Sequence, residues 1–146
     1  MNKKHFILGI IIIIIDQIVK VLMVNKYVTI IPGILNFTYT KNMGAAFGIG
    51  TPIVVLIVNI VLIIGIIIAV IKFKNLITNY IPVTLLLAGG IGNLIDRVFR
   101  GYVIDFIDVN LFDFPNFNIA DICVVFGVIV IIFEIIKKEI ITTNKA

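Results

Sequence analysis

Long apolar runs separated by short polar segments dominate the chain, and four of them are long enough to cross a bilayer. They cover residues 6–24, 52–71, 77–95 and 119–136. A spanning helix needs about 20 mostly apolar residues to cover roughly 30 Å of hydrocarbon. The first run follows basic residues, as in a secretory signal, but Asp16 and Lys20 interrupt it and no small-residue cleavage site follows, so we expect a retained helix. The pattern predicts an all-α membrane protein with four transmembrane helices in a single integral membrane domain, residues 1–146.

The pattern changes between the first two apolar runs. Leu35, Phe37 and Tyr39 alternate with asparagine and threonine, a period of two that is typical of a strand with one apolar face. The "PG" at 32–33 favours a turn just before it. We predict a small antiparallel β-sheet from an outer β region of about 28–48, resting on the membrane surface. A second outer, interfacial loop, rich in aromatic residues and aspartates, is expected over about 98–117.

Positive charges are distributed unequally over the segments that connect the apolar runs. The chain is 61% hydrophobic and 14% charged, and its mean hydropathy of +1.22 far exceeds that of an ordinary soluble domain. By the positive-inside rule, the side with more Lys and Arg is cytoplasmic. One side would hold Lys3, Lys4, Lys72, Lys74, Lys137, Lys138 and Lys145, and the other Lys26, Lys41, Arg97 and Arg100. We therefore expect a multi-pass protein with both termini cytoplasmic and the aspartate-rich loop outside.

The missing residue types exclude several kinds of catalysis. The chain contains no serine, so a serine nucleophile is excluded. His5 is the only histidine and Cys123 the only cysteine, which leaves no disulfide, no histidine-rich metal site and no base to pair with a thiol. We expect Cys123 to pack as a small buried hydrophobic residue. Any catalysis must depend on carboxylates, with help from Asn, Lys, Arg, Thr or Tyr.

The acidic residues divide into two sets. Glu134 and Glu139 lie among lysines near the end of the chain, where a solvated charge is the ordinary interpretation. The outer half holds all the aspartates, which are Asp16, Asp96, Asp105, Asp108, Asp113 and Asp121. Ionisable groups in or beside a spanning segment are costly to bury and usually face a partner or a wet cavity. The aspartates are therefore the candidate functional residues.

Local spacing gives some of these aspartates a structural explanation. Asp16 and Lys20 are four residues apart, so one helix face would hold them as an ion pair that neutralises both charges. Asn118 can cap the fourth helix, and Asp121 can accept backbone N–H bonds at its third position. Asp105, in "YVIDFI", is harder to explain, because its neighbours are apolar and no cation stands beside it.

The end of the third predicted helix carries further polar residues. Asp96 and Arg97 end this helix, and Asn93 lies one turn earlier. Arg97 at an interface can extend its guanidinium toward water, so an orienting role, a headgroup-binding role and a chemical role all stay open.

Five motifs in order resemble the lipoprotein signal peptidase family, also called signal peptidase II. They are "DQIVK" (16–20), "KNMGAAFG" (41–48), "GGIGNLIDR" (89–97), "GYVIDF" (101–106) and "FNIAD" (117–121). The resemblance covers nearly the whole chain and includes the four-helix layout. One departure is Val19, where many members have Ser or Thr before the lysine.

The resemblance implies a bacterial inner-membrane aspartyl peptidase that removes the signal peptide from prolipoproteins whose cysteine carries diacylglycerol. Matched by motif, its catalytic pair is Asp105 of "VIDF" and Asp121 of "FNIAD". The implied supporting residues are Asp16, Lys20, Asn42, Gly44, Asn93, Asp96, Arg97 and Asn118. The expected partners are lipidated prolipoproteins, membrane phospholipid and globomycin-type inhibitors. We expect a monomer that needs no cofactor or metal and binds no nucleic acid.

Acid-base chemistry agrees with that assignment. Two carboxylates that share a site cannot both ionise easily, so one stays protonated and the pair can act as acid and base on one water. The positive end of the fourth helix favours an anion at Asp121, so Asp105 is expected to be the protonated member of the coupled pair. Asn42, Asn93 and Asn118 could orient the substrate or the oxyanion.

Two other classes of protein stay open on the residues alone. A small membrane transporter or an assembly protein could also hold a structural Asp–Lys pair in the membrane. A transporter would more often show repeats or broken helices in both halves, and none is visible. An assembly protein would explain Asp16 and Lys20 but not Asp105. A presenilin-like protease usually has "GxGD", which the sequence lacks.

Overall fold

The computed structural model describes residues 2–44, 51–75, 77–111 and 114–143. Its helices are α1 (Lys3–Leu22), α2 (Pro52–Lys72), α3 (Ile81–Arg100) and α4 (Ile119–Thr143), and its strands are β1 (Val28–Ile31), β2 (Leu35–Asn42) and β3 (Val103–Val109). Each of the four helices is long and apolar enough to cross a membrane. The predicted fold, four apolar helices with a small antiparallel sheet, is therefore confirmed.

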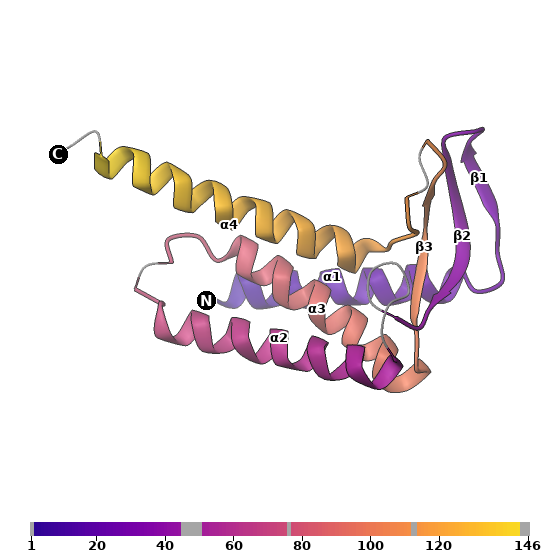
Figure 1. Cartoon of the computed structure of the whole chain (residues 1–146), viewed down its shortest axis with the longest axis horizontal. Coiled ribbons are helices and arrows are strands. Elements are labelled where there is room, and N and C mark those ends of the chain that lie inside the picture. Colours follow the sequence, from indigo (N-terminus) through magenta and orange to yellow (C-terminus); the bar gives the residue numbers. More distant parts are fainter. Residues whose placement is uncertain (1, 45–50, 76, 112–113, 144–146) are drawn as a thin grey trace.

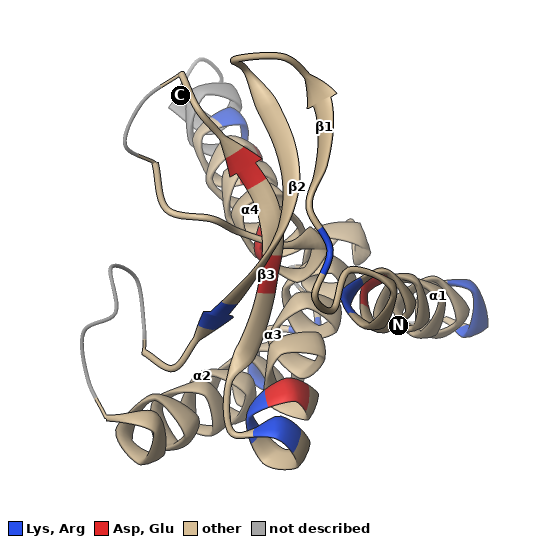
Figure 2. Cartoon of the chain, turned by 90° about the vertical axis from the view of Figure 1, so that its right-hand side faces the viewer, with Lys and Arg blue, Asp and Glu red and all other residues tan. Residues whose placement is uncertain are grey.

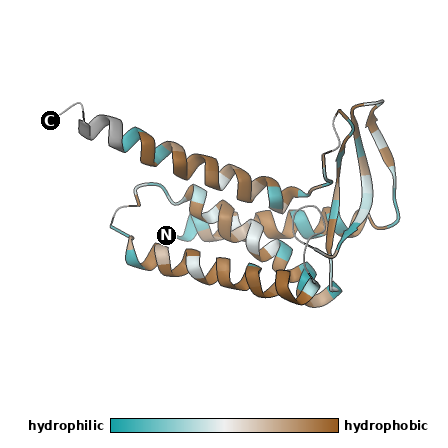
Figure 3. Ribbon diagram, viewed as in Figure 1, coloured by the Kyte–Doolittle hydropathy of each residue, from teal (hydrophilic) through white to brown (hydrophobic). Residues whose placement is uncertain are grey.

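The helix α3 forms the centre of the bundle. The other three helices all pack against it (Figure 1). Of its most apolar stretch 44% is buried, compared with 11% in α1, 11% in α2 and 17% in α4. The helices α1, α2 and α4 are largely hydrophobic, as their brown colour in Figure 3 shows, and most of their large hydrophobic side chains are exposed. Such surfaces suit contact with lipid tails, whereas α3 is the helix that can carry polar groups inward.

Glycines allow α3 to approach its neighbours closely. A Cβ at Gly89 would meet the backbone carbonyl oxygen of Ala120 at the start of α4. A Cβ at Gly92 would lie 3.1 Å from Asp16 Oδ2 on α1 and 3.3 Å from the Ala120 Cβ. Small residues at helix crossings are typical of membrane proteins, where close backbone packing helps helices to associate. The "GGIGN" segment thus brings α1, α3 and α4 together just below the sheet.

The three strands form an antiparallel sheet in the order β1-β2-β3. The sheet stands at the end of the bundle where α1 and α3 end and α4 begins (Figure 1). Gly33, with a φ of 74°, lies in the turn between β1 and β2. In the central pairing Thr40 lies opposite Asp105, and the register shifts between Phe37 and Thr40. The other end of the bundle holds the start of α1 and the end of α4.

Several boundaries differ from those expected from the sequence. The first helix covers Lys3–Leu22 rather than 6–24, and the fourth continues from 136 to Thr143. The third helix covers Ile81–Arg100 rather than 77–95, because Asn79 Oδ1 accepts from the Ile81 N–H and Gly101, with a φ of 78°, ends it. Residues 98–117, expected as a loop, contribute the last turn of α3 and all of β3. Residues 45–48 of the expected β region, and Asp113, lie outside the described residues.

Candidate active site

Asp105 and Asp121, which the sequence places 16 positions apart, lie on adjoining elements at the sheet end of the bundle. Asp105 belongs to β3 and is 2% exposed, and Asp121 is in the first turn of α4 and half-buried. Viewed from the sheet end, β3 crosses in front of the start of α4 and carries acidic residues (Figure 2). The strand and the helix therefore present one carboxylate each to the same region.

Side-chain amides hold the Asp105 carboxylate from two sides. Asn42, the last residue of β2, donates from Nδ2 to Oδ2 of Asp105 at 2.9 Å. Asn118, just before α4, donates from Nδ2 to Oδ1 at 2.7 Å. The Asn42 amide is itself oriented, because its Oδ1 accepts from the backbone N–H of Gly44 at 3.1 Å. Gly44, two residues after Asn42, therefore supports the aspartate through Asn42.

A capping box holds Asp121 at the start of α4. The Asn118 N–H donates to Oδ2 of Asp121 at 3.1 Å, and the Asp121 N–H donates to Oδ1 of Asn118 at 3.0 Å. This reciprocal pair satisfies backbone donors that a helix start otherwise leaves without partners. The cap predicted from "FNIAD" is present. Asn93, on α3, also donates from Nδ2 to Oδ1 of Asp121 at 2.8 Å.

Asn118 and Asn93 connect the two carboxylates through a chain of hydrogen bonds. Asn118 donates from Nδ2 to Asp105 and also, at 3.2 Å, to Oδ1 of Asn93. The Nδ2 of Asn93 in turn donates to Asp121. The same Asn93 oxygen accepts from Lys20 Nζ at 2.9 Å. Because Lys20 and Asn118 both donate to that oxygen, the Asn93 amide can offer only N–H groups to Asp121.

Burial, the largest cause, and the negative charge of Asp121 both raise the pKa of Asp105, whereas the hydrogen bonds from Asn42 and Asn118 and the charge of Lys20 lower it. The net result is a pKa of about 6. The amides fix the position of the carboxylate without supplying a positive charge that would keep it ionised. Asp105 can therefore hold a proton at mildly acidic pH and release it near neutrality, as an acid-base group must.

A second group of charges, which we call the ion cluster, lies behind this site and consists of Asp16, Lys20, Asp96 and Arg100. Lys20 Nζ is 2.7 Å from Oδ2 of Asp16 and 2.9 Å from Oδ2 of Asp96, and all three side chains are fully buried or nearly so. The ion pair predicted from the spacing of Asp16 and Lys20 is present. Asp16 also accepts from the Ala120 N–H at 3.0 Å, which ties α1 to the start of α4.

Arg100 is the outermost member of the ion cluster, and Gln17 forms hydrogen bonds to it. Neither residue was predicted from the sequence as part of the site. Arg100 pairs with Oδ1 of Asp96 and donates to Oε1 of Gln17 at 2.9 Å. Gln17 donates to the same Asp96 oxygen and to the Gly92 carbonyl, both at 3.1 Å. The four-residue spacing of Asp96 and Arg100 was the available signal. Asp96 also accepts from the Ile104 N–H at 3.3 Å, beside Asp105.

Arg97 makes one hydrogen bond within the described residues, and its charge interacts with those of Asp121, Asp105 and Asp96. Its guanidinium donates to the Asn93 carbonyl at 3.4 Å, and its side chain is half-buried at the end of α3. The structure thus brings Asp16, Lys20, Asn42, Gly44, Asn93, Asp96 and Asn118 into contact with one another or with the two candidate aspartates, and leaves Arg97 at the edge. Within the described residues, no group of three or more His, Cys, Asp or Glu side chains could hold a metal ion.

Known proteins are similar to this chain in sequence and in architecture. A family model described as "Signal peptidase (SPase) II" matches residues 8–137. A "Lipoprotein signal peptidase" of Staphylococcus aureus (strain MRSA252) is 39% identical over 161 residues, which cover 99% of this chain and 96% of the relative. A bacterial membrane enzyme solved by the in meso method at 2.3 Å resolution superposes with a TM-score of 0.80 at 35% identity, covering 98% of this chain and 92% of the other. A second such structure, at 1.9 Å, gives a TM-score of 0.78 at 33% identity, covering 92% and 93%.

Proposed function

Because the chain belongs to the signal peptidase II family, and so is a bacterial membrane aspartic endopeptidase that removes signal peptides from prolipoproteins, we propose that Asp105 and Asp121 activate the water for this cleavage. The observation that carries the proposal is the pair of carboxylates joined by Asn118, which donates to Asp105 and forms a reciprocal cap with Asp121. Amides hold both carboxylates, and the described structure gives neither of them a direct ion pair.

The mechanism assigns opposite roles to the two carboxylates. Asp105, whose pKa is raised by burial and by the neighbouring anion, holds the shared proton. Asp121, at the positive end of α4, is the anion. Asp121 takes a proton from the water as its oxygen attacks the scissile carbonyl, and Asp105 donates to the carbonyl oxygen. When the C–N bond breaks, the amine leaves with the proton that Asp121 received, and a hydroxyl of the tetrahedral intermediate returns its proton to Asp105 as the carboxylic acid forms. No other group has to change its charge.

The supporting residues keep this pair in position. Asn42, oriented by Gly44, and Asn118 fix both oxygens of Asp105. Lys20 fixes the Asn93 amide so that it donates to Asp121, and the ion cluster holds α1, α3 and α4 together. Holding catalytic groups within a fraction of an ångström contributes to rate by orientation.

The substrate bond has to reach the end of the bundle, where the helices meet the sheet. We propose that the precursor must be lipidated, because a diacylglyceryl group on the cysteine would hold the adjacent bond at the headgroup boundary. Each buried CH₂ of an acyl chain adds about 0.8 kcal/mol of membrane affinity. Arg97 lies half-buried at this edge and, within the described residues, makes one hydrogen bond, so its guanidinium would be able to bind the substrate backbone or a lipid headgroup.

The proposed orientation puts both termini in the cytoplasm and the aspartates at the outer face. The α2–α3 connection lies at the same end of the bundle as the start of α1, and the sheet lies at the other end (Figure 1). Cysteines at Asn75 and Asn110, both exposed, report on the two ends in a Cys123→Ala background. We expect a membrane-impermeant maleimide to label Asn110→Cys from outside intact cells and to leave Asn75→Cys unlabelled. Labelling of Asn75→Cys from outside would reverse the orientation.

A purified cleavage assay tests the function directly. Protein in detergent is incubated with a diacylglyceryl-modified precursor and with a Cys→Ser precursor that cannot be lipidated, and mass spectrometry detects the released signal peptide. We expect cleavage of the lipidated precursor only, inhibition by globomycin, and activity at dilutions where the protein is a monomer, since one chain supplies both aspartates. Efficient cleavage of the Cys→Ser precursor would refute the requirement for lipid.

A further inference from the structure

Asn59 is the only asparagine of α2, and it lies on the side of that helix that packs against α3. It follows Val55 by four residues and precedes Ile63 by four, and these two are the buried residues of α2. Residues four apart share a helix face, so the three side chains point in nearly the same direction. A Cβ at Gly90 of α3 would lie 3.2 Å from Ile63 Cγ1, so this face meets α3. Asn59 therefore points into the bundle.

Asn93 stands on α3 between the surfaces that meet α2 and α4. A Cβ at Gly89 would meet Ala120 on α4, whereas a Cβ at Gly90 would meet α2. Asn93 follows Gly89 by four residues and Gly90 by three, so it lies one turn further along the strip between these two contacts. From there its Nδ2 donates to Asp121. This strip of α3 is thus the floor of the candidate active site.

Asn59 lies at about the same height in the bundle as Asn93. The helix α2 begins at the sheet end and α3 ends there (Figure 1). Asn59 precedes Ile63 by four residues, which places it about 6 Å nearer to the sheet. Asn93 follows Gly90, the neighbour of Ile63, by three residues and is about 4.5 Å nearer to the sheet. Asn59 on α2 therefore faces the level of the bundle at which Asn93 holds Asp121.

The amide oxygen of Asn59 is open to a further hydrogen bond. Oδ1 is buried and accepts no hydrogen bond within residues 2–44, 51–75, 77–111 and 114–143. A carbonyl oxygen that is kept from water without a donor is costly, and polar side chains inside spanning helices commonly mark a substrate path. The oxygen is thus available to a donor that arrives with the substrate.

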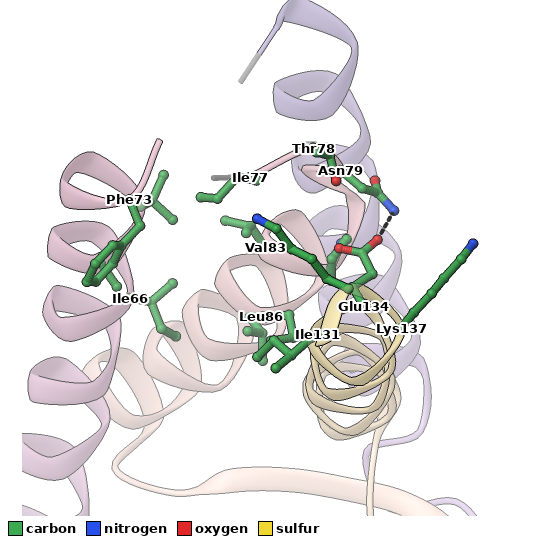
Figure 4. A pocket seen from close by; sticks show the side chains of 15 residues that line it. Ile66, Phe73, Ile77, Thr78, Asn79, Val83, Leu86, Ile131, Glu134 and Lys137 are labelled. Carbon is green, nitrogen blue, oxygen red and sulfur yellow. Dashed lines mark hydrogen bonds between the residues drawn. The ribbon is translucent and has the colours of Figure 1, made fainter. Parts of the chain in front are cut away.

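An apolar groove leads to this level from the interior of the bundle (Figure 4). It lies between α2 and α4 over α3, has a volume of ≈ 890 Å³ and is lined by Ile66 on α2 and Leu86 on α3. Ile66 follows Asn59 by seven residues and Leu86 precedes Asn93 by seven, so each pair shares a helix face about 10 Å apart. An apolar signal helix in this groove would have its outer end beside Asn59 and Asp121.

We propose that Asn59 binds the peptide backbone of the substrate next to the scissile bond, a role that rests on the proposed cleavage function. A primary amide carries a donor and an acceptor, as a peptide group does. Peptide groups inside a helix bond to one another, so the substrate can bind Asn59 only where its chain has left the helix. The scissile carbonyl must also leave the helix before Asp105 can donate to it. Asn59 on one side and Asp121 on the other hold this extended segment and limit its orientations.

Asn59→Leu tests the proposal, because it keeps the approximate size of the side chain and removes its hydrogen-bonding groups. We expect an unfolding temperature in detergent that is unchanged or higher, since an unpaired amide is replaced by an apolar group. On lipidated precursor kcat/KM should fall about threefold to tenfold, the effect of one neutral hydrogen bond, through KM rather than kcat. Val58→Leu, at an exposed neighbouring position, is the matched control and should keep both constants. Loss of folded Asn59→Leu, or a parental KM in the folded variant, would overturn the proposal.

Ester substitutions in the substrate locate the contact. Synthetic lipidated precursors with one amide beside the scissile bond replaced by an ester each lose a single N–H donor. We expect one of these esters to slow the parental protein about threefold to tenfold and Asn59→Leu less than about twofold, because the variant has already lost the contact. Equal slowing of both proteins by every ester would contradict backbone binding by Asn59. If the parental protein cleaved no lipidated precursor, the cleavage function itself would be wrong, whereas parental kinetics of Asn59→Leu would contradict this inference alone.

Discussion

The two groups of buried aspartates differ in the partners that hold them. Asp16 and Asp96 contact the ammonium of Lys20 within 2.9 Å, and Asp96 also pairs with Arg100. Asp105, in contrast, accepts hydrogen bonds from two asparagine amides, and Asp121 from one asparagine amide and a backbone N–H. A cation strongly favours the ionised form of a carboxylate. A neutral amide fixes the position of the carboxylate but favours its ionised form less, so the group can gain and lose a proton more easily.

This difference assigns separate tasks to neighbouring parts of one bundle. The ion cluster neutralises its charges and joins α1, α3 and α4, which suits a structural role. The amide-held pair keeps a carboxyl of raised pKa in a buried position, which suits acid-base chemistry. Variants of the ion cluster should therefore alter the amount of folded protein, and variants of the pair should alter the reaction.

Replacing Lys20 should produce the largest effect on folding. Lys20→Met leaves Asp16 and Asp96 buried beside each other without their shared cation, and breaking a buried ion pair costs about 3–5 kcal/mol. That is a large part of the ~5–15 kcal/mol by which a typical protein is stable. Size-exclusion chromatography and thermal unfolding in detergent should show little folded protein. Lys26→Met, at an exposed position, is the matched control and should fold normally. Normal stability of Lys20→Met would contradict the structural role of the ion cluster.

Gly89 tests whether both groups depend on the close approach of α3 and α4. The Cβ of Gly89→Ala would meet the Ala120 carbonyl oxygen and lie 2.8 Å from Val124 Cγ2. Separating the helices should cost about 1–3 kcal/mol and draw Asn93 away from Asp121, so stability and cleavage should both fall. A Cβ at Gly65 meets nothing within 4 Å, so Gly65→Ala should change neither. The measurements are the unfolding temperature and the cleavage rate of each variant. Identical values for the two variants would show that neither group of aspartates depends on the close packing of α3 against α4.

The smallest effect expected is a shift in pH dependence. Since Asp105 must hold the proton, kcat/KM should fall as the pH rises through about 6, the pKa of its carboxyl. The Asn42 hydrogen bond lowers that pKa by favouring the ionised form. Asn42→Ala should therefore raise it and move the alkaline limb to higher pH, in addition to any loss of rate. The measurement is a pH profile of kcat/KM on lipidated precursor.

A neighbouring asparagine provides the control for that profile. Asn116 donates to Thr38 at 2.9 Å and to Thr40 at 2.7 Å, and these two threonines lie on β2 with Asn42. No hydrogen bond in the described structure joins Asn116 to either candidate aspartate. Asn116→Ala should leave the alkaline limb in place. A limb that moves to lower pH in Asn42→Ala, or equally in both variants, would show that the amide does not control the proton on Asp105.

Local features of both groups could be predicted from the sequence. The four apolar runs follow from length and hydropathy. The Asp16–Lys20 pair follows from its four-residue spacing, and the Asn118–Asp121 cap from its three-residue spacing. Each of these interactions lies within a single helical turn. The sequence alone therefore contains the information needed to propose them.

Contacts between distant segments could not be predicted in this way. Residues 98–117 were expected to form a loop, although Val103–Val109 forms β3 by pairing with β2, a distant segment of the chain. Asn42 and Asn93 were expected to orient substrate or an oxyanion, whereas in the structure they donate to Asp105 and Asp121. Gln17 lies beside Asp16 on α1, but its hydrogen bonds reach Asp96 and the Gly92 carbonyl on α3, which no local pattern indicates.

The division of tasks between the two groups of aspartates is tested by the cleavage rate per folded molecule in Asp105→Asn and Asp16→Asn, each measured on lipidated precursor after size-exclusion chromatography. We expect Asp105→Asn to yield folded protein whose rate falls by more than about 10²-fold, because one member of the acid-base pair is lost. Asp16→Asn should yield much less folded protein, and the molecules that do fold should keep most of their rate. Cleavage at the parental rate by Asp105→Asn, or an equally complete loss of rate in folded Asp16→Asn, would contradict the division between the two groups.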